Sequence, residues 1–293
     1  MVAPSITDNF SVSVVIPTYN RINLLPEAID SVLSQSYPVS EVIVVDDGST
    51  DHTFETLASK YQKVKFLKQE NLGVSAARNT GVSEAKSNWI AFLDSDDQWE
   101  TQKIEKQIEF LAQNPGFKAC HTGEKWIRNG NQVQQPAFLN KVTEGLFERS
   151  LERCIICPSS VMLHYSVFMQ IGTFDRDLKV CEDYDFWIRL MLSMEIGLIN
   201  EPLVIKKGGH QDQLSSSVWG LDRFRVQSLE KIIKSEKVNS CQKVQILKTI
   251  AHKTNLLAKG FTKHKKLNDA QFFEEKRART LDQLSTLSGK ATA

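Results

Sequence analysis

The stretch that most constrains the fold is a short apolar run that ends in three carboxylates. Residues 89–93 read Trp-Ile-Ala-Phe-Leu, and Asp94, Asp96 and Asp97 follow directly. An uninterrupted run of aromatic and branched apolar residues predicts a strand that is buried on both faces. On an extended strand end, Asp94 and Asp96 share one face, where their carboxylates repel each other unless a cation lies between them. The alternative is a solvated acidic turn, with Asp97 as the N-cap of a helix that starts near Trp99.

The residues before this stretch alternate between strand patterns and helix patterns. Strands are expected at 12–16, 41–45 and 64–67, and helices at 24–33 and about 53–61. The segment 71–81 is expected to begin as a loop and to continue as a helix. Pro17 is expected to end the first strand, and Pro26 suits the first turn of the helix that follows. Alternating strands and helices predict an α/β fold, with a mainly parallel sheet flanked by helices.

Polar residues follow the predicted strands at 12–16, 41–45 and 89–93, at the point where each strand ends. They are Thr18-Tyr19-Asn20, Asp46-Asp47-Gly48-Ser49 and Asp94-Ser95-Asp96. In open parallel sheets, ligands bind at the carboxyl ends of the strands, so these three ends predict one binding crevice. The first strand lacks the Gly-x-Gly-x-x-Gly turn that binds dinucleotides, which argues against an NAD-binding protein.

The charge of the chain is divided between two unequal parts. The formal net charge is only +1 over 293 residues, yet residues 221–293 carry 16 Lys and Arg against 7 Asp and Glu, or +9, and residues 1–220 carry 20 against 28, or −8. Apolar residues at helical spacing run through the basic part, which is therefore expected to be helical. This part either packs on the rest of the chain or meets an anionic membrane surface or a partner. No nucleic-acid partner is expected.

Neither the N-terminus nor the cysteines indicate secretion. The N-terminus lacks the layout of a signal peptide, and no apolar run reaches membrane-spanning length. The five cysteines are scattered, and Cys154 and Cys157 lack the second pair that a zinc site would need, so reduced thiols are expected. We expect a cytoplasmic protein, with peripheral contact to the inner face of a membrane as an option.

Several motifs, in order along the chain, resemble the family 2 glycosyltransferases. They are Pro17-Thr18-Tyr19-Asn20, Val44-Val45-Asp46-Asp47-Gly48-Ser49-Thr50-Asp51 and Phe92-Leu93-Asp94-Ser95-Asp96-Asp97. The likeness covers about the first hundred residues, resumes at Glu182-Asp183-Tyr184-Asp185-Phe186-Trp187 and fades after about residue 220. It implies the GT-A fold and the transfer of a sugar from a nucleotide-diphosphate sugar with inversion.

The resemblance implies that the first motifs bind the nucleotide. Asp47 has the position at which such enzymes hydrogen-bond the base, which favours uridine, and Tyr19 can stack on the base. A plain turn is the alternative for residues 46–49. Arg78 either reaches the phosphates with its guanidinium or lies on a helix surface. The remaining residues of the implied nucleotide site are Pro17, Thr18, Arg21, Asp94 and Ser95.

The same resemblance implies a divalent metal, Mn²⁺ or Mg²⁺, at the acidic strand end. Asp96 is the implied ligand, and Asp94 is oriented toward the ribose or a metal-bound water. His210, in a loop after a short strand at 203–207, is implied near the metal or the diphosphate, and a solvated loop histidine is the alternative. Such a metal neutralises the charge that builds on the departing nucleoside diphosphate.

The motif at residues 182–187 begins with two acids, and the resemblance implies that one of them is the catalytic base. By resemblance Asp183 takes the proton from the acceptor hydroxyl, and Glu182 beside it orients the acceptor or tunes charge. The alternative is a helix that is simply stabilised by acids in its first turn. Asp185 and Arg189, four positions apart, are expected to form a structural ion pair.

Together these observations predict a GT-A-like catalytic domain followed by a basic appendage. The catalytic domain is expected over residues 1–220, with a nucleotide-binding half at about 10–115 and an acceptor half at about 116–220, and the basic helical segment over 221–293. The predicted activity is glycosyl transfer to a hydroxyl acceptor, as in the synthesis of a polysaccharide or other glycan. Two alternatives stay open. One is a metal-dependent nucleotidyltransferase or phosphohydrolase, and the other is a non-catalytic platform that binds nucleotide-sugars.

Overall fold

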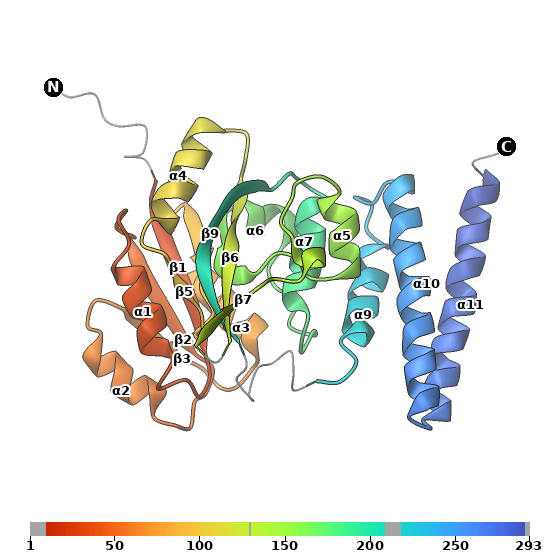
Figure 1. The fold of residues 1–293 in the computed structure, drawn as a ribbon, viewed down its shortest axis with the longest axis horizontal. Helices are drawn as coiled ribbons and strands as arrows, with labels where there is room; N and C mark the ends of the chain where they lie inside the picture. Colours follow the sequence, from red (N-terminus) through yellow and green to blue (C-terminus); the bar gives the residue numbers. More distant parts are fainter. Residues whose placement is uncertain (1–9, 129, 209–217, 291–293) are drawn as a thin grey trace.

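The computed structural model describes residues 10–128, 130–208 and 218–290. Within these ranges one nine-stranded sheet has the order β3-β2-β1-β4-β8-β6-β9-β5, with β7 paired to β6. The strands are β1 Val12–Thr18, β2 Glu41–Asp46, β3 Lys65–Lys68, β4 Trp89–Phe92, β5 Gln98–Trp99, β6 Ala119–Arg128, β7 Asn131–Val133, β8 Val161–His164 and β9 Gly197–Gly208. Figure 1 shows the sheet flanked by helices, with a helical C-terminal region beside it. The predicted fold class is confirmed.

The helices follow the alternation that the sequence predicts in the first hundred residues. Those that flank the sheet are α1 Leu25–Leu33, α2 Thr53–Lys60, α3 Val74–Glu84, α4 Lys103–Gln113, α5 Leu146–Glu152, α6 Ser166–Ile171 and α7 Glu182–Met191, with short 3-10 helices η2 Ala137–Leu139 and η3 Pro158–Ser160. The C-terminal region consists of α9 Asp222–Ile232, α10 Ser240–Lys263 and α11 Leu267–Lys290.

The first strand extends beyond the proline that was predicted to end it. β1 pairs in parallel with β2 as far as Thr18, and Pro17 lies inside the strand opposite Val45. The prediction that Pro17 ends the strand was therefore wrong. Proline costs no ladder hydrogen bond at this position, because β4 pairs with β1 only up to Val15 and no other strand among the described residues pairs with that side of Pro17.

The acidic residues after β4 lie on a turn and not on an extended strand end. The Asp97 amide donates to the Asp94 carbonyl at 3.0 Å, which closes a tight turn over residues 94–97. The premise that Asp94 and Asp96 share a strand face was therefore wrong. The next helix, α4, begins at Lys103 with Gln102 as its N-cap. Asp97 is thus too far away to be the N-cap of that helix.

Each face of the sheet carries its own hydrophobic cluster. Successive side chains of a strand point to opposite faces. Val14 and Ile16 of β1 accordingly pack with α1, α2 and α4, whereas Val15 packs with α3, α5, α6 and α7. Glycine is required where α3 crosses β1, because a Cβ on Gly81 would lie 2.2 Å from Cγ1 of Val15. This close approach fixes α3 beneath the carboxyl edge of the sheet.

The C-terminal helices share a hydrophobic cluster with the sheet-flanking helix α7. Tyr184 and Ile188 of α7 pack with Val226 of α9, and the cluster continues through α10 and α11. The Ser228 hydroxyl of α9 also donates to the Asp185 carboxylate of α7 at 2.8 Å. α10 and α11 form an antiparallel hairpin beside α9 (Figure 1). No helix in the described part of the chain is long and apolar enough to cross a membrane.

A buried lysine in α4 gives the fold a measurable dependence on pH. Lys103 is fully buried, its ammonium donates to Gln107 Oε1 at 2.7 Å, and burial lowers its pKa to about 7. Between this pKa and the value of 10.5 for an exposed lysine, the unfolded chain binds the extra proton, so stability rises with pH.

We expect the free energy of unfolding of the wild type, relative to that of Lys103→Met, to rise by about 1.4 kcal/mol per pH unit above pH 7. Urea unfolding of both proteins at pH 7, 8 and 9 measures this difference. Lys63→Met, at an exposed position, is the matched control and should show no such trend. Parallel pH profiles for wild type and Lys103→Met would contradict the expectation.

Candidate active site

A cleft of about 540 Å³ opens at the carboxyl edge of the sheet. Its walls come from the ends of β1, β2, β4 and β9 and from the starts of α3 and α7. The predicted site residues that line it are Pro17, Thr18, Tyr19, Arg21, Asp47, Arg78, Asp94, Ser95, Asp96, Glu182 and Asp183. His210 lies outside the described residues. The cleft therefore brings together the predicted site residues that the structure describes.

The Asp47 carboxylate anchors the loop between β3 and α3. Its Oδ1 accepts from Gln69 Nε2 at 2.7 Å and from the Leu72 amide at 3.0 Å, and its Oδ2 accepts from the Gly73 amide at 2.8 Å. A carboxylate has about four acceptor positions, so these three bonds leave one for a ligand N–H. Asp47 can thus support the loop and accept a hydrogen bond from a bound base.

Arg78 links the acidic turn to the start of α7. Its Nη2 lies 2.8 Å from Asp94 Oδ1 and its Nη1 lies 2.6 Å from Glu182 Oε1. Only 3% of Arg78 is exposed, so the helix-surface alternative is wrong. Both terminal nitrogens contact carboxylates in this structure. The arginine therefore sets the relative positions of Asp94 and Glu182, two residues that come from distant parts of the sequence.

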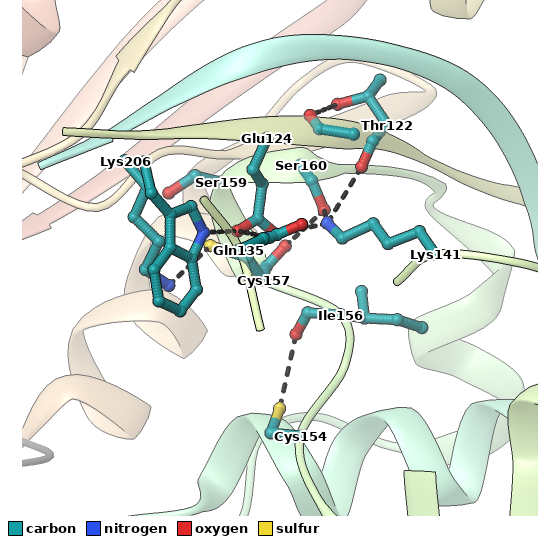
Figure 2. A network of polar contacts seen from close by, with 12 residues as sticks. Thr122, Glu124, Gln135, Lys141, Cys154, Ile156, Cys157, Ser159, Ser160 and Lys206 are labelled. Atoms are coloured by element: carbon teal, nitrogen blue, oxygen red, sulfur yellow. Dashed lines mark hydrogen bonds and ion pairs between the residues drawn. The ribbon is translucent and has the colours of Figure 1, made fainter. Parts of the chain in front are cut away.

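Figure 2 shows a polar network next to the cleft that contains a second cation, Lys206, whose charge interacts with Asp94 and Asp97 of the acidic turn. Lys206 on β9 lines the cleft, and its ammonium donates to Cys157 Sγ at 3.4 Å. Burial opposes the charge on Lys206, but nearby acids, among them Glu124 and Asp97, raise its pKa well above the usual value. Glu124 in turn forms a buried ion pair with Lys141, which fastens the segment before α5 to β6.

Two groups of side chains at the acidic turn can be compared as metal ligands. Ligand atoms of Asp94, Asp97 and Cys157 all lie within 4.8 Å of one another. However, burial raises the pKa of the Cys157 thiol to about 12, and a protonated thiol does not suit a hard divalent ion. Asp97 is also occupied, because it accepts from the Ser159 hydroxyl at 2.7 Å.

Asp94 and Asp96 offer the better fit to Mn²⁺ or Mg²⁺. Both line the cleft, and burial together with the charge of Asp94 raises the pKa of Asp96. Two neighbouring carboxylates at the edge of an open cleft suit a hard divalent ion, which binds oxygen ligands and relieves the repulsion that Asp94 exerts on the charge of Asp96. The residues present therefore fit such an ion.

The two acids at the start of α7 lie in different surroundings. Glu182 is 5% exposed and paired with Arg78, and burial, reinforced by Asp183, raises its pKa to about 7. Asp183 is half-buried and lines the cleft, and its Oδ2 accepts from the Cys154 thiol at 3.3 Å. Among the described residues, Asp183 has no ionic partner at hydrogen-bonding distance. It is therefore the one of these two acids whose carboxylate faces the cleft unpaired by a cation.

Several cleft residues were not found by sequence reasoning. They are Cys154, Lys179, Cys181, Lys206, Lys207 and Arg225. Arg225 belongs to α9, so the basic C-terminal segment contributes to the wall of the cleft. The Cys154 thiol contacts Asp183 and the Cys157 thiol contacts Lys206, and the spacing of the two cysteines did not indicate either contact. The expected ion pair of Asp185 with Arg189 is confirmed, with Oδ2 and Nε 2.8 Å apart.

Known structures share this architecture. The structure of S. aureus TarS 1–349 in complex with UDP-GlcNAc superposes with a TM-score of 0.65 at 19% sequence identity, and the match covers 92% of each chain. The mannosyltransferase from Pyrobaculum calidifontis in complex with GDP-Man and Mn²⁺ gives a TM-score of 0.65 at 21% identity, and covers 100% of this chain and 83% of that one. At these identities the likeness establishes the fold, which is GT-A.

Sequence relatives are named as glycosyltransferases. The UDP-Glc:alpha-D-GlcNAc-diphosphoundecaprenol beta-1,3-glucosyltransferase of Escherichia coli is 31% identical over 220 residues, which cover 74% of this chain and 83% of that protein. An uncharacterised glycosyltransferase of Rickettsia felis is 34% identical over 203 residues, or 69% of this chain, but the match spans only 33% of that longer protein. The profile of the family described as Glycosyl transferase family 2 matches residues 13–172. With the fold and the cleft in place, these matches show that the chain belongs to glycosyltransferase family 2.

Proposed function

We propose that this glycosyltransferase is an inverting enzyme that transfers a sugar from a UDP-sugar to a hydroxyl acceptor. Asp183 acts as the base, and Asp96, with Asp94, holds a divalent metal. The observation that carries the proposal is the shared cleft, which places Asp47, the acidic turn and Asp183 around one cavity. His210 stays a proposed further contact to the metal or diphosphate.

In the proposed reaction, the acceptor oxygen forms a bond to the anomeric carbon as the bond from that carbon to the UDP oxygen breaks. The acceptor proton passes to the Asp183 carboxylate, so the products are the glycosylated acceptor, UDP and a protonated Asp183. Attack opposite to the leaving group inverts the anomeric centre. A bound divalent metal neutralises negative charge on the departing diphosphate.

The choice of Asp183 over Glu182 rests on their partners. Glu182 is buried and its Oε1 contacts the Arg78 guanidinium at 2.6 Å, so turning it toward an acceptor would leave a buried cation without this partner. Breaking a buried pair in this way is costly. Among the described residues, Asp183 has only a thiol and the Tyr184 amide as hydrogen-bond donors, and it lines the cleft. Glu182 then acts as a positioning residue that holds α7 through Arg78.

The acceptor is proposed to be a growing glycan that carries a phosphate group. The E. coli relative is named for a diphosphoundecaprenol-linked acceptor. In this chain, Lys179 and Arg225 line the same cleft as Asp183. Cations at this position complement an anionic acceptor, because guanidinium and ammonium groups form charge-assisted hydrogen bonds with phosphate oxygens.

Transfer is tested by incubating the pure protein with UDP-sugars, Mn²⁺ and glycan acceptors with and without a lipid diphosphate. We expect release of UDP that depends on the acceptor and a product with the inverted anomeric configuration. Release of a nucleoside monophosphate or of pyrophosphate would instead favour a phosphohydrolase or a nucleotidyltransferase. Tight UDP-sugar binding without turnover over the whole acceptor panel would favour a binding platform.

A further expectation concerns how the nucleotide base is read. Asp47→Asn keeps one oxygen for the Gln69 and Leu72 donors but places an NH₂ group where Oδ2 accepts now. Loss of one hydrogen bond to a charged acceptor costs about 1.5–3 kcal/mol, so UDP binding should weaken by about 10- to 150-fold. Titration calorimetry with UDP, CDP and GDP measures the effect. If the three nucleotides keep their relative affinities in the variant, Asp47 does not read the base.

A further inference from the structure

The tip of the α10–α11 hairpin concentrates positive charge. The hairpin tip, as the term is used below, consists of the exposed residues Lys259, Lys263, His264, Lys265, Lys266 and Leu267. Asp269 is the one acidic residue between positions 259 and 273. Within the described part of the chain, none of the four lysines forms an ion pair. Their charge is therefore available to a partner.

Two large apolar side chains stand beside these charges. Leu267 is 67% exposed and Trp219 is 48% exposed. Trp219 packs edge-on against Phe261, with 4.9 Å between ring centroids, and the Lys266 ammonium lies 5.8 Å from the Trp219 ring. Exposed aromatic and aliphatic side chains flanked by lysines are typical of surfaces that enter the headgroup region of anionic membranes.

The hairpin holds the tip in place on the side of the molecule where the cleft opens. Phe261 of α10 stacks on Phe273 of α11 just behind the tip, with 5.4 Å between centroids, and the Lys266 amide donates to the Phe261 carbonyl at 2.9 Å. In Figure 1 the α10–α11 turn lies at the lower edge of the view, toward which the carboxyl ends of β1, β2 and β9 also point. The tip and the cleft thus face the same side.

We propose that the hairpin tip, together with Trp219, docks on an anionic lipid bilayer. The lysines meet the lipid phosphates and Leu267 enters the headgroup region. Docking in this orientation turns the cleft toward the bilayer surface, where a lipid-anchored acceptor would meet Asp183. This consequence for catalysis rests on the proposed function, whereas lipid binding itself does not.

Sedimentation of the full chain with vesicles measures binding without any need for turnover. We expect binding to vesicles of 30 mol % phosphatidylglycerol in phosphatidylcholine, roughly the charge of an anionic membrane, with an affinity that falls as salt rises. Pure phosphatidylcholine vesicles should bind little protein. Each basic residue at such a surface strengthens binding about fivefold, so the combined variant Lys263→Glu, Lys265→Glu and Lys266→Glu should lose at least about 100-fold in affinity.

A matched control variant makes the same change in net charge as the hairpin-tip variant, but at the opposite edge of the sheet. Lys63, Lys86 and Lys118 are exposed and precede β3, β4 and β6, so they lie at the amino ends of parallel strands. The triple change of these lysines to Glu should retain most of the lipid affinity. Leu267→Ser tests the apolar contact and should weaken binding to vesicles without affecting binding to a soluble oligonucleotide.

Three outcomes would overturn the proposal. The first is absence of vesicle binding by the wild type at low salt. The second is an equal loss in the control variant, which would assign the binding to net charge. The third is binding to the oligonucleotide that exceeds binding to vesicles, which would assign the hairpin tip to a different anionic partner. UDP titration of each variant verifies that the cleft is intact, so a failure of lipid docking is separable from a failure of the proposed function.

Discussion

Asp183→Asn should slow glycosyl transfer by about 10²–10⁴-fold, because an amide cannot take the proton of the acceptor hydroxyl. Asparagine keeps the shape of the side chain, and its Oδ1 can still accept from the Tyr184 amide, which lies 2.7 Å from Asp183 Oδ1. The dissociation constant of UDP should hardly change, because the proposed nucleotide contacts are Asp47 and the acidic turn. A coupled assay for UDP release gives kcat, and titration calorimetry gives the UDP affinity.

Two control variants separate the base from its surroundings. Asp177→Asn removes an acid that is 82% exposed, and it should leave both kcat and UDP affinity unchanged. Glu182→Gln weakens the ionic contact to Arg78, so a loss of stability should accompany any loss of activity. If Asp183→Asn keeps near-normal turnover while Glu182→Gln is stable and inactive, the base is Glu182. Normal turnover in both variants would leave the inverting mechanism without its base.

The sheet and the strand ends were predictable from local patterns. Apolar runs such as 42–45 and 89–93 have the length and composition of buried strands, and alternation with helices indicates a parallel sheet. Parallel strands bring their carboxyl ends to one edge, which is why Asp47 and the acidic turn could be placed together without coordinates. Motif resemblance then joined Asp183, which lies 86 positions after Asp97, to the same site.

The electrostatic partners of these residues could not be predicted. Arg78 contacts Asp94 and Glu182 because Gly81 lets α3 approach β1, and spacing in the sequence does not encode this contact. Lys206 on β9 contacts Cys157, which precedes η3 and lies 49 positions earlier in the sequence. Side chains that meet only through tertiary packing leave no periodic signal in the sequence.

The Pro17 error has a similar physical cause. A proline is unfavourable in a central strand because it lacks an N–H, so the sequence predicts a strand end. No hydrogen bond between strands is lost here, because the neighbouring strand β4 stops before it reaches Pro17. The length of one strand therefore decides whether proline is tolerated in another. Local sequence rules contain no information about that relation.

Replacing Asp96 with Asn should remove the gain in UDP affinity that Mn²⁺ provides. A neutral amide is a weaker ligand for a hard divalent ion than a carboxylate, and Asp94 alone would then offer one charge at the cleft edge. Without the metal, charge on the departing diphosphate lacks its main neutralising group, so transfer should slow by about 10³-fold. Titration of the variant with UDP, in Mn²⁺ and in EDTA, should give the same dissociation constant under both conditions.

The competing ligand group makes this prediction sharper. If Asp94, Asp97 and Cys157 hold the metal instead, Cys157→Ser should abolish the Mn²⁺ effect, and Asp96→Asn should preserve it. We expect the reverse, because burial raises the pKa of the Cys157 thiol to about 12 and the Lys206 ammonium beside it repels a second cation. Lys206→Met tests whether the metal lies at the acidic turn at all, whichever of the two ligand groups holds it, by electron paramagnetic resonance of bound Mn²⁺. Removing the ammonium should tighten Mn²⁺ binding if the metal lies at the acidic turn, whereas unchanged affinity would place the metal elsewhere.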